Sequence, residues 1–150
     1  MTKKSRSKLA IVASHPIQYY SPLFRELAQR GGLLVLYAHR PTEKDQAAVG
    51  FGVDFEWDID LMSGYQSEFL ENTARNVSLE RFSGLDSPVA YDRLKRARPD
   101  AVLVLGWHFK SYIQAIIAAK RLRIPVLVRG DSQLETPRSW LRRAIKAVAY

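Results

Sequence analysis

The sequence predicts an α/β fold in which a doubly wound, mainly parallel sheet of five or six strands has helices on both faces. Residues 101–106 and 125–129 are nearly continuous apolar runs, which is typical of parallel strands buried on both sides. The stretch between them has the apolar periodicity of a helix, so the three segments indicate one βαβ crossover. A second unit of this kind occupies residues 8–38. We therefore expect both apolar runs to be central strands and the first strand to lie beside residues 101–106.

The first βαβ unit begins with a predicted strand over residues 8–14. A helix follows with Ser21 as its N-cap and Pro22 as its first residue, and a pair of glycines ends it. Residues 33–38 form the next strand. The turn after the first strand lacks Gly-x-Gly-x-x-Gly, and the P-loop pattern occurs nowhere, which argues against the usual dinucleotide and P-loop sites.

The middle of the chain, residues 39–86, is less regular. Apolar and acidic residues alternate over 55–61, which predicts a half-exposed strand at or near a sheet edge. Gly64-Tyr65 and Asn72 mark turns, and the region is long enough to place a surface loop over a site. A short helix opening at Pro88 then leads to the strand at 101.

Two further helices are predicted in the last third. One begins at Ser111 and ends before Pro125, with cations near its end that suit the helix dipole. The other runs from Thr136-Pro137 to Tyr150 and has one apolar face. Its opposite face carries four bases, Arg138, Arg142, Arg143 and Lys146. No internal repeat divides the chain, so residues 1–150 are predicted to form a single domain.

Composition limits the chemistry. The net charge of +8, from 23 Lys and Arg against 15 Asp and Glu, suits nucleic acid, an anionic membrane surface or a phosphorylated ligand. The absence of cysteine excludes disulfides and thiolate catalysis and agrees with a reducing compartment. Histidines at positions 15, 39 and 108 show no ligand spacing, so no metal is expected. No targeting signal or membrane span is visible, and no nucleic-acid-binding motif accompanies the charge.

Polar residues follow the predicted strands at the edge where parallel sheets bind ligands. Trp107 and His108 follow one apolar run, and Arg129, Asp131 and Ser132 follow the other. We expect one site to use both clusters.

Each of these candidates also has a plain structural interpretation. The His108 imidazole could act at a sugar hydroxyl or a reacting oxygen, or it could be satisfied by backbone. His15 and Gln18 follow the first strand, either in a site or in a rigid turn. The cluster beginning at Arg129 suits a ligand with many hydroxyls, but its Asp and Ser could instead cap local backbone. The basic C-terminal helix suits either an anionic membrane or solvent.

The chain resembles the N-terminal half of a GT-B glycosyltransferase and is most similar to the bacterial family 4 enzymes. Four segments carry the resemblance: Leu9 to Phe24, Trp57 to Leu61 with Gly64-Tyr65, Gly106-Trp107-His108, and Pro125 to Ser132. The resemblance implies a Rossmann-like acceptor-side domain that faces a second, donor-binding domain across a cleft. It also places His108 near the anomeric centre, and His15 and Gln18 where donor phosphate or acceptor binds. The Gly-Gly pair that many members carry in the first loop is absent here.

The resemblance implies a retaining transferase that moves a sugar from a nucleotide-activated donor to a glycan or lipid-linked acceptor, as in the synthesis of cell-envelope polysaccharide. No cofactor or metal is expected. The donor-binding half is not among these 150 residues, so they would not transfer sugar alone. We expect a cytoplasmic location, with peripheral contact at the inner face of the membrane. The alternative is a non-catalytic α/β module whose loops only hold a ligand or a partner.

Overall fold

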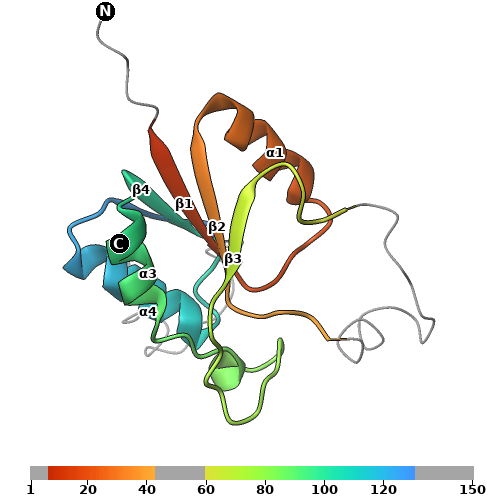
Figure 1. Cartoon of the computed structure of the whole chain (residues 1–150). Coiled ribbons are helices and arrows are strands. Elements are labelled where there is room, and N and C mark those ends of the chain that lie inside the picture. Colours follow the sequence, from red (N-terminus) through yellow and green to blue (C-terminus); the bar gives the residue numbers. More distant parts are fainter. Residues whose placement is uncertain (1–6, 43–59, 131–150) are drawn as a thin grey trace, which may run out of the picture.

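The computed structural model describes residues 7–42 and 60–130. In this part of the chain five strands form one parallel sheet in the order β3-β2-β1-β4-β5. The strands are β1 (Lys8–Ala13), β2 (Gly32–Tyr37), β3 (Gln66–Phe69), β4 (Ala101–Val104) and β5 (Val126–Val128). The helices are α1 (Ser21–Arg30), α3 (Ala90–Ala97) and α4 (Lys110–Arg121), with a 3-10 turn, η1 (Phe82–Gly84). The predicted α/β fold is confirmed (Figure 1).

Helices cover both faces of the sheet because neighbouring residues of each strand point in opposite directions. From β1, Ile11 points to the face covered by α1, where it joins a core with Phe24. Its neighbour Val12 points to the other face, where Leu94 of α3 and Ala115 of α4 complete a larger core. All five side chains are at most 1% exposed. Apolar runs without alternation are what this two-sided burial requires.

Strand β1 lies at the centre of the sheet, between β2 and β4. Leu9 is level with Ala101 of β4 and with Leu33 of β2. The expected pairing of the first strand with residues 101–106 is therefore confirmed, although β4 itself ends at Val104.

The start of α1 differs from the prediction. Tyr20, not Ser21, is the N-cap, and it makes no side-chain capping bond. The Ser21 side chain is fully buried and donates its hydroxyl to the Leu61 carbonyl at 3.0 Å. Ser21 therefore ties α1 to a segment 40 residues away instead of capping its own helix.

The third strand was not anticipated. Residues 55–59 of the predicted strand at 55–61 lie outside the described part, and residues 60 and 61 are not in a strand. Strand β3 instead follows the expected turn at Gly64, whose φ is +85°, and pairs with β2. Its four residues are short of apolar character, so its pairing rather than its pattern identifies it.

The run at 125–129 does not form a central strand in the described sheet. Strand β5 pairs there with β4 alone and lies at the edge, and Leu127 is 55% exposed. The apolar run was a poor guide because it reports the tendency to be buried, not the number of neighbours present. The predicted helix from Thr136-Pro137 to Tyr150 lies outside the described residues.

The segment between β3 and α3 is a closed loop held at its base by a hydrogen bond between Asn72 and Asp86. The Asn72 side-chain oxygen accepts from the backbone N–H groups of Ala74 and Asp86, both at 3.0 Å. Near the loop tip the Ser78 N–H donates to the Gly84 carbonyl at 3.2 Å. A Cβ added at Gly84 would lie 2.0 Å from the Ser78 carbonyl oxygen, so this approach requires glycine.

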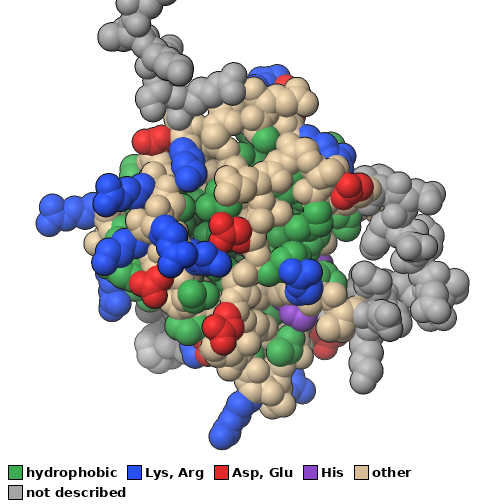
Figure 2. Space-filling model, in the orientation of Figure 1, with side chains coloured by type: hydrophobic (Ala, Val, Ile, Leu, Met, Phe, Trp, Pro, Cys, Tyr) green, Lys and Arg blue, Asp and Glu red, His purple; other side chains and the backbone are tan. Residues whose placement is uncertain are grey.

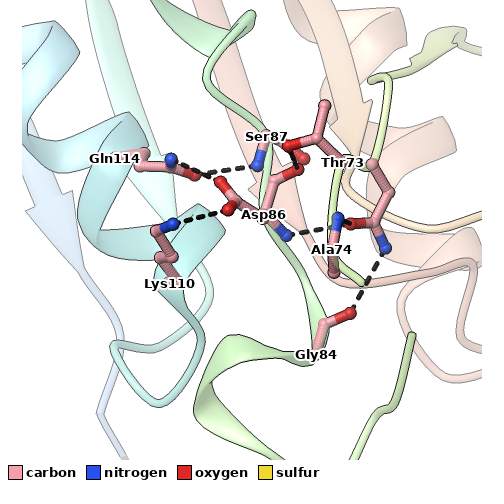
Figure 3. Close-up of polar contacts among 8 residues, drawn as sticks. Thr73, Ala74, Gly84, Asp86, Ser87, Lys110 and Gln114 are labelled. Atoms are coloured by element: carbon pink, nitrogen blue, oxygen red, sulfur yellow. Dashed lines mark hydrogen bonds and ion pairs between the residues drawn. The ribbon is translucent and has the colours of Figure 1, made fainter. Parts of the chain in front are cut away.

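Asp86 also fixes the loop to the start of α4. Its carboxylate accepts from the Lys110 ammonium at 2.5 Å and from the Gln114 amide at 2.7 Å, and the Gln114 oxygen accepts from the Ser87 N–H at 2.8 Å (Figure 3). The Asp86 side chain is 19% exposed, so solvent screens the ion pair only in part. The base of the loop and the first turn of α4 therefore form one polar unit.

We expect Asp86→Asn to make the protein less sensitive to acid. The hydrogen bond from Lys110, assisted by that from Gln114, lowers the pKa of Asp86 below its ordinary value of 3.8. A carboxylate with a lowered folded-state pKa stabilises the fold above its unfolded-state pKa and loses this contribution as the pH falls through the folded value. The free energy of unfolding of the parent protein should therefore fall more steeply below about pH 4 than that of the variant.

Urea unfolding at a series of pH values measures this difference. At pH 7 the variant should be less stable by about 1–3 kcal/mol, the usual cost of weakening hydrogen bonds to a charged group. Glu80→Gln, which neutralises an exposed carboxylate in the same loop, is the matched control and should keep the parent profile. Parallel profiles for the parent and Asp86→Asn would contradict the prediction.

Candidate functional site

The candidate site lies where the chain direction across the sheet reverses. From β1 the chain passes to β2 on one side, whereas β4 and then β5 lie on the other side. The loops that leave the carboxyl ends of β1 and β4 therefore lead to helices on opposite faces of the sheet, which is the usual position of the ligand site in open α/β sheets. His15 follows β1 and His108 follows β4, so the sheet brings both predicted histidines to this edge.

The loop after β1 begins with a buried hydroxyl. The Ser14 side chain is 5% exposed, and its Oγ lies 3.0 Å from Nδ1 of His15. This hydrogen bond orients the half-buried imidazole ring. Gln18 and Tyr19 are exposed further along the loop, and Tyr20 turns back into the core. The loop after β1 therefore carries His15 and Gln18 and is anchored at its start by Ser14 and at its end by Tyr20.

The loop after β4 depends on Gly106, whose φ is +131°, a conformation that side chains disfavour. A Cβ there would lie 2.9 Å from Nδ1 of His108 and 3.1 Å from Cε2 of Tyr112. The glycine therefore lets the imidazole lie close to the backbone. The His108 ring packs at 4.3 Å from the Phe109 ring and edge-on at 5.4 Å from the Tyr112 ring. His108 is an exposed residue whose ring is supported by these two aromatic rings.

Tyr112 of α4 joins the two loops. Its side chain is 2% exposed, and burial raises the pKa of Tyr112 to about 12, with hydrogen bonding to Ser14 acting in the opposite direction. The phenol is thus neutral at physiological pH. Tyr112 therefore contacts both Ser14, at the start of the loop after β1, and the His108 ring. Neither Ser14 nor Tyr112 was predicted as a site residue. The only signals in the sequence were that Ser14 directly precedes His15 and that Tyr112 comes four residues after His108.

Arg129 reaches the first loop from the end of β5. Its guanidinium carbon lies 5.3 Å from the centroid of the Tyr20 ring, a cation–π contact. The backbone N–H of Arg129 donates to the Val104 carbonyl at 2.9 Å. Arg129 is therefore brought to the loop after β1, while the use of one site by His108 and the cluster at Arg129 stays a prediction. Asp131 and Ser132 lie outside the described residues. Trp107 is half-buried beside His108.

The site offers imidazoles, a guanidinium and hydroxyls, a set suited to hydrogen bonding with phosphate and sugar oxygens. Within the described residues no three His, Asp or Glu side chains gather as metal ligands. In the same part of the chain, every helix is too short or too polar to cross a membrane. A scan against models of protein families and a search of curated protein sequences found no match to this chain.

Proposed function

We propose that the chain is the acceptor-side domain of a retaining glycosyltransferase of the GT-B type, similar to family 4, acting with a nucleotide-activated sugar. The observation that carries the proposal is that His15 and His108 follow the paired strands β1 and β4 at the same end of the sheet, with Arg129 against Tyr20 of the loop after β1. This end of the sheet is where α/β domains bind polar ligands. The sequence resemblance at the same loops supports the same activity.

In this proposal His108 is the residue that acts at the sugar. Its ring packs against Phe109 and Tyr112, which holds the imidazole in place for a hydrogen bond to the sugar. His15, fixed by Ser14, and Gln18 bind acceptor or phosphate oxygens. Arg129 supplies positive charge from the end of β5. Most stabilisation of the departing diphosphate comes from the donor-binding half.

The acceptor is proposed to be a glycan or a lipid-linked glycan. For a lipid-linked acceptor, peripheral contact with an anionic membrane through the bases at 138–146 would bring enzyme and substrate to one surface. The cytoplasmic side of the membrane is the proposed location.

The test is a screen of the protein, joined to its donor-binding half, against nucleotide sugars. We expect one donor to be hydrolysed slowly and to be consumed faster when a glycan acceptor is added, with retention at the anomeric carbon. Mass spectrometry and proton NMR of the product measure both. Ligand binding without turnover of any donor would favour the non-catalytic module instead.

A further inference from the structure

The loop after β1 leaves a large aromatic ring in water. Tyr19 is 69% exposed, the highest value among the large hydrophobic residues that the structure describes. It lies between Gln18, a predicted site residue, and Tyr20, the N-cap of α1. Burial against the rest of the protein therefore gives this ring little stabilisation. The proposed function assigns it no role.

Neighbouring rings hold Tyr19 in position. Its ring centroid lies 4.6 Å from that of Tyr20, with the two planes tilted by 52°. Tyr20 is itself 9% exposed and stacks on Phe24 of α1 at 5.7 Å, with the planes 5° apart. Because Tyr20 and Phe24 belong to the core on this face of the sheet, the exposed ring packs against a fixed partner. A ligand that contacts Tyr19 therefore immobilises little that is not already held.

Tyr19 belongs to the same cluster of contacts as His108 and Arg129. The Arg129 guanidinium packs on the Tyr20 ring, which Tyr19 also contacts. Burial raises the pKa of the Tyr112 phenol, and the phenols of Tyr20 and Tyr19 raise it further, so both lie near enough to act on it electrostatically. Tyr112 in turn packs edge-on against the His108 ring. The exposed ring of Tyr19 therefore adjoins the candidate site.

The surroundings of Tyr19 are polar but carry little charge. From Ser14 to Tyr20 the loop holds no Lys, Arg, Asp or Glu. Lys and Arg side chains gather instead over the region of α3 (Figure 2), and α3 packs on the opposite face of the sheet from α1. The loop therefore favours a neutral ligand rich in hydroxyls, to which the Gln18 amide and the His15 imidazole can hydrogen bond.

A sugar ring combines the two features that this surface offers to a ligand. The C–H groups on one face of a pyranose form an apolar surface that packs on an aromatic ring, and the hydroxyls at its edge form hydrogen bonds. A hydrocarbon chain would use the Tyr19 ring but would leave the polar groups beside it desolvated. A phosphate or a carboxylate would gain nothing from the ring.

We propose that Tyr19 is a platform on which a sugar ring of the acceptor stacks, while Gln18 and His15 hydrogen bond to its hydroxyls. That the bound sugar is the acceptor rests on the proposed function. Stacking holds the sugar and takes no part in breaking or forming a bond. Tyr19 is therefore a binding residue that sets the affinity for the acceptor.

The probes are methyl β-glucoside, methyl β-galactoside and methyl α-mannoside, added to the chain and observed by saturation-transfer difference NMR. For at least one glycoside we expect the C–H protons on one face of the ring to receive more saturation than those on the other face. Titration of this signal gives the dissociation constant. Tyr19→Ala should weaken binding about tenfold, and Tyr19→Trp, which keeps an aromatic ring, should retain it.

The matched control is Phe82→Ala, which removes another exposed aromatic ring, in η1, and should bind as the parent does. Thermal unfolding confirms that the variants are folded. Absence of binding by all three glycosides, even saturation of both ring faces, or equal binding by Tyr19→Ala and the control would overturn the proposal. Binding of uridine but of no glycoside, lost in Tyr19→Ala, would assign the ring to a nucleobase and also overturn it.

Kinetics distinguish the sugar platform from the transferase activity. Glycoside binding that depends on Tyr19, without turnover of any nucleotide sugar by the chain joined to a donor-binding half, would support the platform and contradict the transferase. Where transfer occurs, Tyr19→Ala should raise the Michaelis constant for the acceptor more than it lowers the turnover number. Transfer with an unchanged Michaelis constant in this variant would contradict the platform and support the transferase.

Discussion

With the proposed glycosyltransferase activity, turnover of the chain joined to a donor-binding half should fall by about 10²–10⁴-fold when His108 is replaced by Ala, the range typical of losing a positioned acid–base or polar group. Its stability should change by no more than about 0.5 kcal/mol, because the side chain is exposed and the supporting rings of Phe109 and Tyr112 remain packed. The turnover number and the free energy of unfolding are measured on the same preparation. A residue acting mainly in the transition state should lower the turnover number more than it raises the Michaelis constant.

The matched control is Arg121→Ala, an exposed truncation at the other end of α4, which should keep parent turnover and stability. Parent turnover in a folded His108→Ala enzyme would remove His108 from the site. Loss of stability with unchanged specific activity would assign it a structural role instead.

The largest loss of stability is expected from Gly84→Ala. The new methyl carbon would lie 2.0 Å from the Ser78 carbonyl oxygen, and because this oxygen belongs to the backbone and the position of Cβ is fixed by the backbone at residue 84, the closed loop has to open. The loop also carries Leu79 against the core and Leu85 within it, so opening disturbs packing as well. We expect a cost of about 2–3 kcal/mol, in the range for inserting a methyl group into closely packed structure.

Urea unfolding at neutral pH measures this cost. Ser83→Ala, at an exposed position in the same turn η1, is the control and should stay within about 0.5 kcal/mol of the parent. Equal stabilities for the two variants would show that the loop tolerates a wider separation of Ser78 and Gly84.

The sequence predicted well those strands in which consecutive residues are apolar and buried. β1, β2 and β4 follow this rule, because each lies between two neighbours and two helix layers. β3 was not predicted because Gln66 and Glu68 interrupt any apolar pattern, and its position in the sheet is set by pairing with β2. The pattern of β5 was visible, but its edge position depends on neighbours that the pattern does not encode.

The candidate site was predictable to the same degree. The positions of His15 and His108 follow from strand ends, which apolar runs reveal. The supporting contacts of Tyr112 do not, because they depend on how α4 packs beside the loop after β1. The role of Ser21 was hidden for a similar reason: its partner, Leu61, lies 40 residues further along the chain.

The central position of β1 also shapes how the protein is made. One edge of β1 pairs with β2, which follows after a single short helix. The other edge can pair only when β4 has been synthesised, and the Lys8 N–H likewise donates to the carboxylate of Asp100, 92 residues further along the chain. At ribosomal speed the nascent chain carries this apolar edge unpaired for about 5–20 s. Long-range closure also slows folding, and an open apolar edge can pair with another chain. Chaperone demand during synthesis should therefore decrease once β4 has emerged from the ribosome and paired with β1.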